Sequence, residues 1–350
     1  MMYRGKDFFV LALAVTLIAG RTAAAAPLTV NGEVATPLTL NADALGGTPV
    51  SATIGGVQYS GSSVYSLISD AGFQNNPAQA KNGNLLDYLT ITGTGGQSVV
   101  LSEGQIDPNF GGQTANPQSF IANSANGSPI TPLLIVQSDP NGTTDGYDFA
   151  GVTNIKVGWA AVPALSASVL NNETAFTVTG DIASPPVSYS TSNFSSVFAT
   201  QTTQTDTFLS GATPTTATFT GVPIFTLLEN AGFLTDPSNP QSVLDDYIVV
   251  TGSNEPTTTS PFDYAVLYSL GEIDPSFNAF TSATVPLLAE VGGTTFRSTA
   301  PSDSRGGRYD SDVVNINVVN AVPEPGSLAL MLPPLILFFA LGRRWRGCQA

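Results

Sequence analysis

The sequence predicts a strand-dominated α+β fold, made by tandem duplication of one mixed α+β domain. Charged residues form only 11% of the 350 positions, and the chain contains 34 Gly and 25 Pro, a composition that favours strands joined by many turns. Matching blocks of sequence also occur twice in the same order, and each copy is long enough to be a domain. We therefore predict repeat domains at residues 28–159 and 175–320, separated by a partly apolar linker at 160–174.

The best-matched block is a short polar turn. Ser102-Glu-Gly-Gln-Ile-Asp-Pro-Asn-Phe110 in the first copy corresponds without a gap to Ser269-Leu-Gly-Glu-Ile-Asp-Pro-Ser-Phe277 in the second. Each copy starts with a serine followed three residues later by Gln or Glu, the spacing of a capping box, and the Asp-Pro that follows ends the helix. We expect one capped helical turn in each copy. Because Gln105 and Glu272 alternate at one position, capping explains them better than acid catalysis does.

The other elements of the first copy follow from hydrophobic periodicity. Val64, Leu67, Ile68 and Ala71 have helical spacing, and Gly72 follows them, so we predict a helix over 64–71. Alternating or continuously apolar runs predict strands at 28–34, 87–93, 98–101, 133–136 and 152–157.

The second copy replays these elements. We predict strands at 177–181, 246–252 and 313–318, and a helix over 224–231 with Pro223 at its start, where proline is tolerated. The helices at 64–71 and 224–231 should occupy equivalent places in the two repeats.

Both ends of the chain carry targeting features. Residues 1–25 combine an early positive charge, an apolar run too short to span a membrane and a small-residue cleavage site, so we predict a cleavable signal peptide. At the other end, residues 326–342 form an apolar run followed by three arginines, which predicts a membrane helix with its end held in the cytoplasm. The alternative, a core helix, has no following element to pack against. We expect export through the inner membrane and C-terminal anchoring.

The residue inventory excludes several functions. Between Pro27 and Pro325 the chain has five basic residues against 25 acidic ones, so this region repels phosphate backbones and we expect no nucleic-acid binding. There is no histidine, and the single cysteine is Cys348. An internal disulfide, a Ser-His-Asp or Cys-His nucleophile and a zinc site built from His or Cys are thereby excluded.

The tail resembles the PEP-CTERM sorting signal. It has a Val-Pro-Glu-Pro block, an apolar helix and a terminal arginine cluster in that order. The residues concerned are Val322, Pro323, Glu324, Pro325, Arg343, Arg344 and Arg346. The resemblance implies recognition by exosortase-type sorting machinery in a Gram-negative producer of exopolysaccharide. It also implies display at the cell surface or release, and extracellular polysaccharide is then a candidate partner.

The repeats resemble the sulfite-oxidase-type oxidoreductase molybdopterin-binding domain. The similarity is strongest in the second copy, at residues 219–232, 264–275 and 297–309. It implies a mixed α+β fold. In catalytic members a cysteine thiolate ligates molybdenum, and His and Arg side chains hold the pterin. This chain lacks such a cysteine and all histidine, so we expect degenerate domains without molybdopterin.

Two loops contain candidate binding residues. Asp303, Arg305, Arg308 and Tyr309 lie where the resemblance places the cofactor loop and could contact an anion or a sugar; the alternative, which we favour, is pairing of the arginines with nearby acids. Asp139, Asn141 and Asp145 offer closely spaced oxygen donors, so calcium is the one cofactor left open. An ordinary Asx-rich turn is the favoured explanation there.

The leading functional hypothesis is an exported, surface-sorted binding or extracellular-matrix protein without catalytic activity. The alternative is an exported molybdopterin-dependent oxidoreductase that holds its cofactor in an atypical way, through Arg305, Arg308 and backbone donors. A third hypothesis, a carboxylate-based hydrolase, depends only on the abundance of acids, since no pair is marked out by its spacing.

Overall fold

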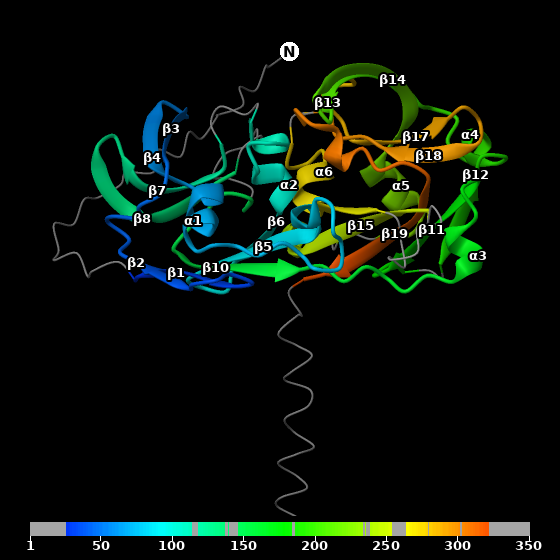
Figure 1. Ribbon diagram of the computed structural model, residues 1–350. Coiled ribbons are helices and arrows are strands. Elements are labelled where there is room, and N and C mark those ends of the chain that lie inside the picture. Colours follow the sequence, from blue (N-terminus) through cyan, green and yellow to red (C-terminus); the bar gives the residue numbers. More distant parts are fainter. Residues whose placement is uncertain are drawn as a thin grey trace, which may run out of the picture.

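A computed structural model describes residues 26–113, 118–136, 139, 146–183, 186–233, 235, 239–253, 264–278, 280–301 and 303–321. Strands dominate this part of the chain, and short helices lie between them, as the sequence predicted (Figure 1). The predicted signal peptide, the sorting tail and its apolar run lie outside the described residues. Within the described ranges, no helix is long and apolar enough to cross a membrane.

The first half has two five-stranded sheets, of which one has the strand order β2-β1-β10-β5-β6. Strand β1 runs parallel to β10, and the other neighbours are antiparallel. The strands are β1 (Leu28–Gly32), β2 (Leu38–Leu40), β5 (Asp87–Gly93), β6 (Ser98–Ser102) and β10 (Val152–Trp159).

A second sheet in the first half has the order β3-β4-β7-β8-β9 and is antiparallel throughout. Helix α1 (Val64–Asp70) follows β4 directly, and α2 (Glu103–Ile106) follows β6. The strands are β3 (Pro49–Ile54), β4 (Val57–Ser63), β7 (Phe120–Ala125), β8 (Ser128–Ile135) and β9 (Phe149–Ala150); the 3-10 turns are η1 (Gly83–Leu86) and η2 (Gly111–Gln113).

The second half repeats this topology. Its larger sheet has the order β12-β11-β19-β15-β16, in which only β11 and β19 are parallel, and its smaller sheet has the order β13-β14-β17-β18. The strands are β11 (Ala175–Gly180), β12 (Val187–Ser190), β13 (Thr202–Ser210), β14 (Thr213–Pro223), β15 (Asp246–Gly252), β16 (Ala265–Ser269), β17 (Leu287–Val291), β18 (Thr295–Ser298) and β19 (Val313–Asn320). The helical elements are α4 (Phe194–Val197), α5 (Ile224–Asn230), α6 (Leu270–Ile273), η4 (Pro240–Asp245) and η5 (Gly306–Arg308).

The strand that opens each repeat ends in a glycine, and the backbone conformation explains why. Gly32 and Gly180 end β1 and β11 with φ angles of +88° and +89°, a region that favours glycine. A Cβ atom would lie 2.1 Å from the Val157 carbonyl oxygen at Gly32 and 2.0 Å from the Val318 carbonyl oxygen at Gly180. Both repeats therefore need glycine where the parallel strand pair ends.

The predicted helices and strands are present, with boundaries shifted by a few residues. Helices α1 and α5 directly follow the equivalent strands β4 and β14 and lie in corresponding places, as expected. The predicted linker packs against the protein: it contains α3 (Ala167–Leu170), and its residues Ala160 and Leu170 are buried in a cluster with Val249 and Leu267.

The two halves share one hydrophobic core. A single cluster of buried residues includes Leu89 and Ile91 of β5 together with Ile248 and Val250 of β15. The equivalent tyrosines Tyr88 and Tyr247 stack on each other across the junction, with ring centroids 4.8 Å apart. Figure 1 shows α2 and α6 between the halves, so the duplicated turns lie at the junction.

Candidate functional site

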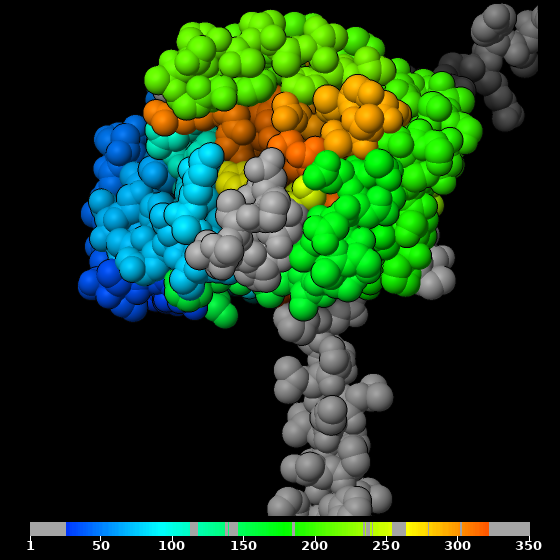
Figure 2. Space-filling view, turned by 45° about the vertical axis from the view of Figure 1, so that its right-hand side comes forward, coloured from blue at the N-terminus to red at the C-terminus, as the bar shows by residue number. Residues whose placement is uncertain are grey.

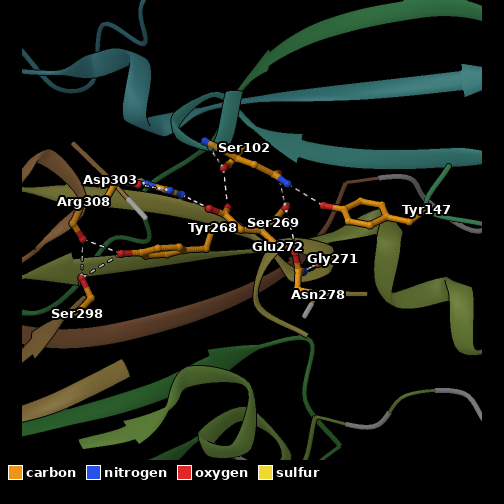
Figure 3. A network of polar contacts seen from close by, with 11 residues as sticks. Ser102, Tyr147, Tyr268, Ser269, Gly271, Glu272, Asn278, Ser298, Asp303 and Arg308 are labelled. Carbon is orange, nitrogen blue, oxygen red and sulfur yellow. Dashed lines mark hydrogen bonds and ion pairs between the residues drawn. The ribbon is translucent and has the colours of Figure 1, made fainter. Parts of the chain in front are cut away.

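The duplicated turns bond to each other across the junction. In each turn the serine accepts a hydrogen bond from the third backbone N–H, at 3.0 Å for Ser102 and 3.2 Å for Ser269. The serine hydroxyls then donate to the opposite repeat: Ser102 to Glu272 Oε2 at 2.7 Å, and Ser269 to Gln105 Oε1 at 3.2 Å (Figure 3). The serine half of the predicted capping box is therefore confirmed. The other half is wrong, because Gln105 and Glu272 bond to the serine of the opposite repeat and not to their own helix start.

Arg308 lies inside this junction with two carboxylates. Its Nε and Nη2 donate to Asp303 at 2.8 and 2.6 Å, and Nη1 pairs with Glu272 (Figure 3). The Arg308 side chain is only 3% exposed. Burial raises the pKa of Asp303 to about 6, although Arg308 opposes this shift. Burial also disfavours the charge on Arg308, but Asp303 and Glu272 outweigh it and raise the pKa of the guanidinium above its usual value.

Tyr147 holds the corresponding place in the first repeat. It precedes β10 by five positions, as Arg308 precedes β19. The Tyr147 hydroxyl accepts a hydrogen bond from Gln105 Nε2 at 2.9 Å, and its ring meets Phe277 edge-on at 5.7 Å. Burial raises the pKa of this phenol far above its usual value.

Each of these side chains packs on the turn glycine of the other repeat. A Cβ atom on Gly104 would lie 2.7 Å from Arg308 Cδ, and one on Gly271 would lie 3.0 Å from the Tyr147 ring. At both turns a side chain from the opposite half passes over the glycine, and at Gly271 the Leu244 side chain of its own repeat lies closer still, 2.8 Å from that Cβ position. The repeats are interlocked by this reciprocal packing.

A polar cleft of about 860 Å³ opens beside this junction. Figure 2 shows the surface around residues 297–311, in orange, between the β13–β14 hairpin and the cyan segment near residue 80. The residues that line the cleft include Gln79, Lys81, Asn82, Asn84, Asp107, Asn109, Phe110, Phe208, Ser210, Tyr264, Arg297, Arg305, Tyr309, Asp310 and Ser311.

Three cations converge on this cleft. Lys81, Arg297 and Arg305 line it, and they are three of the five basic residues between Pro27 and Pro325. The ion pairs within the described residues involve none of the three. The Nε of Arg297 is buried and has no acceptor among the described residues. Because the three cations have no ion-pair partner among the described residues, the cleft offers positive charge to an anion.

Hydrogen bonds across the junction hold the cleft walls in place. Asn82 donates to the Tyr264 hydroxyl at 2.8 Å, and the Ala265 N–H donates to Gln79 Oε1 at 2.7 Å. On the other wall, the Ser304 hydroxyl donates to the Asn109 carbonyl at 2.8 Å. The cleft is therefore formed by both repeats and is organised before any ligand arrives.

The structure divides the predicted ligand-binding residues into two groups. Asp303 and Arg308 lie in the buried ion network, whereas Arg305 is exposed in the cleft. Tyr309 lines the cleft with its ring stacked 4.1 Å from that of Phe208. Sequence reasoning missed Lys81 and Arg297, because the cleft brings them together from segments far apart in the chain.

The predicted calcium loop is mostly outside the described residues. Asn141 and Asp145 lie there, and only Asp139 is described. The nearby Asp148 accepts a hydrogen bond from the Val136 N–H at 2.6 Å. Within the described ranges, no group of three His, Cys, Asp or Glu residues is arranged to hold a metal ion. The calcium site stays a prediction.

Two acidic side chains of the first repeat, Glu103 and Asp107, are buried beside the cleft. Asn84 donates to Glu103 Oε2 at 2.9 Å and to Asp107 Oδ2 at 3.2 Å. Burial, with Asp107 and Asp87 nearby, raises the pKa of Glu103 well above its usual value. The second repeat has Leu270 at the position of Glu103. The duplicated turn therefore forms without a carboxylate at this position.

Asp87 should make stability fall as pH rises. Burial raises its pKa from 3.8 to about 8, although the nearby Asn76 backbone opposes this shift. The unfolded chain releases this proton near 3.8 and the folded protein near 8, so between these values the folded state binds more protons. The free energy of unfolding should decrease by up to about 1.4 kcal/mol per pH unit in this window. Urea unfolding of the wild type and Asp87→Asn at pH 5 and pH 8 checks this: the variant should decline less steeply, and equal slopes would contradict the assignment.

Comparisons with known proteins identify no family. No family model matches the chain, and no curated protein matches it. Among solved structures, it is distantly similar to the sulfane dehydrogenase SoxCD from Paracoccus pantotrophus, at 13% identity and a TM-score of 0.27. The alignment covers 69% of this chain and 62% of that chain.

The residues present do not fit a molybdopterin centre. The catalytic members of the family that the repeats resemble use a cysteine thiolate and histidines, but the chain has no histidine, and Cys348 lies outside the described residues, beyond the predicted membrane run. Arg308, the most buried cation of the resembling loop, is already bound to Asp303 and Glu272. Binding a pterin phosphate through Arg308 would leave two carboxylates buried without their partner.

Proposed function

We propose that this chain is an exported, surface-sorted binding or matrix protein without catalytic activity, built from two degenerate repeats. The observation that supports this proposal most directly is that Arg308 is buried and bound to two carboxylates. Its charge is neutralised by Asp303 and Glu272 of its own repeat, and its side chain packs over Gly104 of the other repeat. Export, sorting by exosortase-type machinery and surface display are proposed from the terminal sequence features alone.

The alternative oxidoreductase needs a different arrangement of the same loop. Holding a cofactor through Arg308 requires that this side chain leave its two carboxylates, whereas Arg305 of the same loop is already exposed. The binding protein is the preferred proposal because Arg308 already has two carboxylate partners.

Metal and pterin analysis tests the proposal. The full-length protein, purified from its native host, should contain molybdenum and pterin far below one per chain, measured by mass spectrometry of the metal and fluorescence of the oxidised pterin. Stoichiometric molybdenum together with pterin would overturn the proposal and favour the oxidoreductase. The Arg308→Gln variant is the matched control, because it should then lose the cofactor.

A further inference from the structure

We propose that the cleft between the repeats binds a short saccharide bearing isolated carboxylate groups, held through Lys81, Arg297 and Arg305. This inference builds on the proposed binding function and names its ligand class. The starting point is the distribution of charge: the chain has a formal charge of −15, yet three of its few cations line one cleft. Solubility does not explain why three positive side chains gather in one cleft of so acidic a protein.

The three cations are available to a ligand. Lys81 and Arg305 are exposed, and Arg297 is partly buried with its Nε unpaired in the described part of the chain. Arg308 shows the contrast, since it lies in the same loop as Arg305 but is fully committed to two carboxylates. An arginine without a carboxylate partner keeps its planar donors for bidentate contact with an incoming one.

The surrounding charge restricts the ligand to one with few charges. Asp107 and Asp310 also line the cleft, and the rest of the protein is strongly acidic. A dense polyanion would meet this repulsion along its whole length, whereas a short ligand with a few carboxylates, separated by sugar rings, meets the local cations at short range. This argument excludes nucleic acid and highly sulfated chains and favours a sparsely charged molecule.

The remaining lining points to a saccharide over an acidic peptide. Asn84, Asn109, Ser210 and Ser311 line the cleft with side chains that both donate and accept hydrogen bonds, which suits the hydroxyl groups of a sugar. Tyr264 adds an aromatic ring with a polar end. A volume of about 860 Å³ is within the usual range of ligand pockets and accommodates a short oligosaccharide.

The cation positions are held by the fold. Gln79 Nε2 donates to the Lys81 carbonyl at 2.9 Å, so the backbone that carries Lys81 is fixed. Arg297 lies on β18 and forms a backbone bridge with Ser311, and Arg305 forms one with Leu209 of β13. Little backbone ordering is then needed on binding, which favours affinity.

Titration calorimetry at low salt with trigalacturonate tests the proposal, with the neutral galactotriose and triglutamate as control ligands. Trigalacturonate should bind, and the other two should bind at least tenfold more weakly or not at all. The double variant Arg297→Gln/Arg305→Gln should weaken trigalacturonate binding about tenfold or more, the loss of about 1.4 kcal/mol. The single variant Lys81→Gln should weaken it several-fold. The matched control is Lys156→Gln, which removes the same charge from an exposed position on β10 and should change binding less than twofold.

Each other result overturns the ligand assignment. If trigalacturonate does not bind, or if galactotriose binds equally well, carboxylate recognition in the cleft is wrong. Equal binding of triglutamate would replace the saccharide with an acidic peptide. Equal effects of Lys156→Gln and the double variant would show that net charge, not the cleft, controls binding. These binding measurements do not depend on the molybdenum or pterin content of the protein. A wrong ligand assignment can therefore be told apart from a wrong proposed function.

Discussion

Replacing Arg308 with leucine is expected to lower the free energy of unfolding by about 3–5 kcal/mol, the usual effect of removing one partner of a buried ion pair. The variant would leave Asp303 and Glu272 buried without their cation, because all three side chains are largely excluded from water. Among the described residues, the Glu272 carboxylate would keep the hydrogen bond from Ser102 across the junction. The effect should be seen as a lower midpoint in urea unfolding at pH 7.

Arg305→Gln is the matched control for this prediction. It lies three positions away in the same loop but is exposed, and no ion pair holds it among the described residues. A change at such a surface site should alter stability by no more than about 0.5 kcal/mol. If Arg308→Leu and Arg305→Gln unfold at the same urea concentration, the ion network does not stabilise the junction as described.

The sequence was most informative where local rules decide the structure. Helical spacing before Gly72 placed α1 within one residue, and the Ser-x-x-Gln/Glu pattern located both capped turns. These features depend on residues a few positions apart, so a single segment contains the information. The repeated order of blocks likewise predicted a repeated arrangement of strands.

The junction could not be predicted in the same way. The capping pattern is satisfied locally in a peptide, but Glu272 and Gln105 instead bond to serines 170 and 164 positions away. Only the packing of one repeat on the other brings these groups together. Alignment of the two copies does contain a hint, because Arg308 and Tyr147 precede equivalent strands and each packs on an equivalent glycine.

The cleft was missed for a related reason. Two of its three cations, Lys81 and Arg297, come from different repeats and belong to no motif. The loop containing Arg305 and Arg308 was recognised, but the sequence did not separate the exposed arginine from the buried one. The two arginines differ in how deeply they are buried. Arg308 passes over Gly104 into the junction, whereas Arg305 pairs through its backbone with Leu209 at the cleft wall.

Replacing Tyr147 with alanine is expected to have an effect as large as that of Arg308→Leu. Tyr147 is fully buried, and removing a buried aromatic side chain destabilises by about 3–5 kcal/mol, through lost contact area and the cavity left behind. The change would also deprive the Gln105 amide of its acceptor and Phe277 of its edge-on neighbour. Because the two halves share one core, we expect a single urea transition at a lower midpoint, not separate unfolding of the first repeat.

Tyr147→Phe separates the two contributions of this side chain. It keeps the ring over Gly271 but removes the hydroxyl that accepts from Gln105, so it should destabilise by about 1–3 kcal/mol, the effect of leaving a buried donor unpaired. Fluorescence and far-UV circular dichroism, recorded on the same urea series, should give coincident transitions for both variants. An alanine variant that unfolds in two steps, or one as stable as the wild type, would show that the repeats stand independently and that the interlocked junction is not what holds them together.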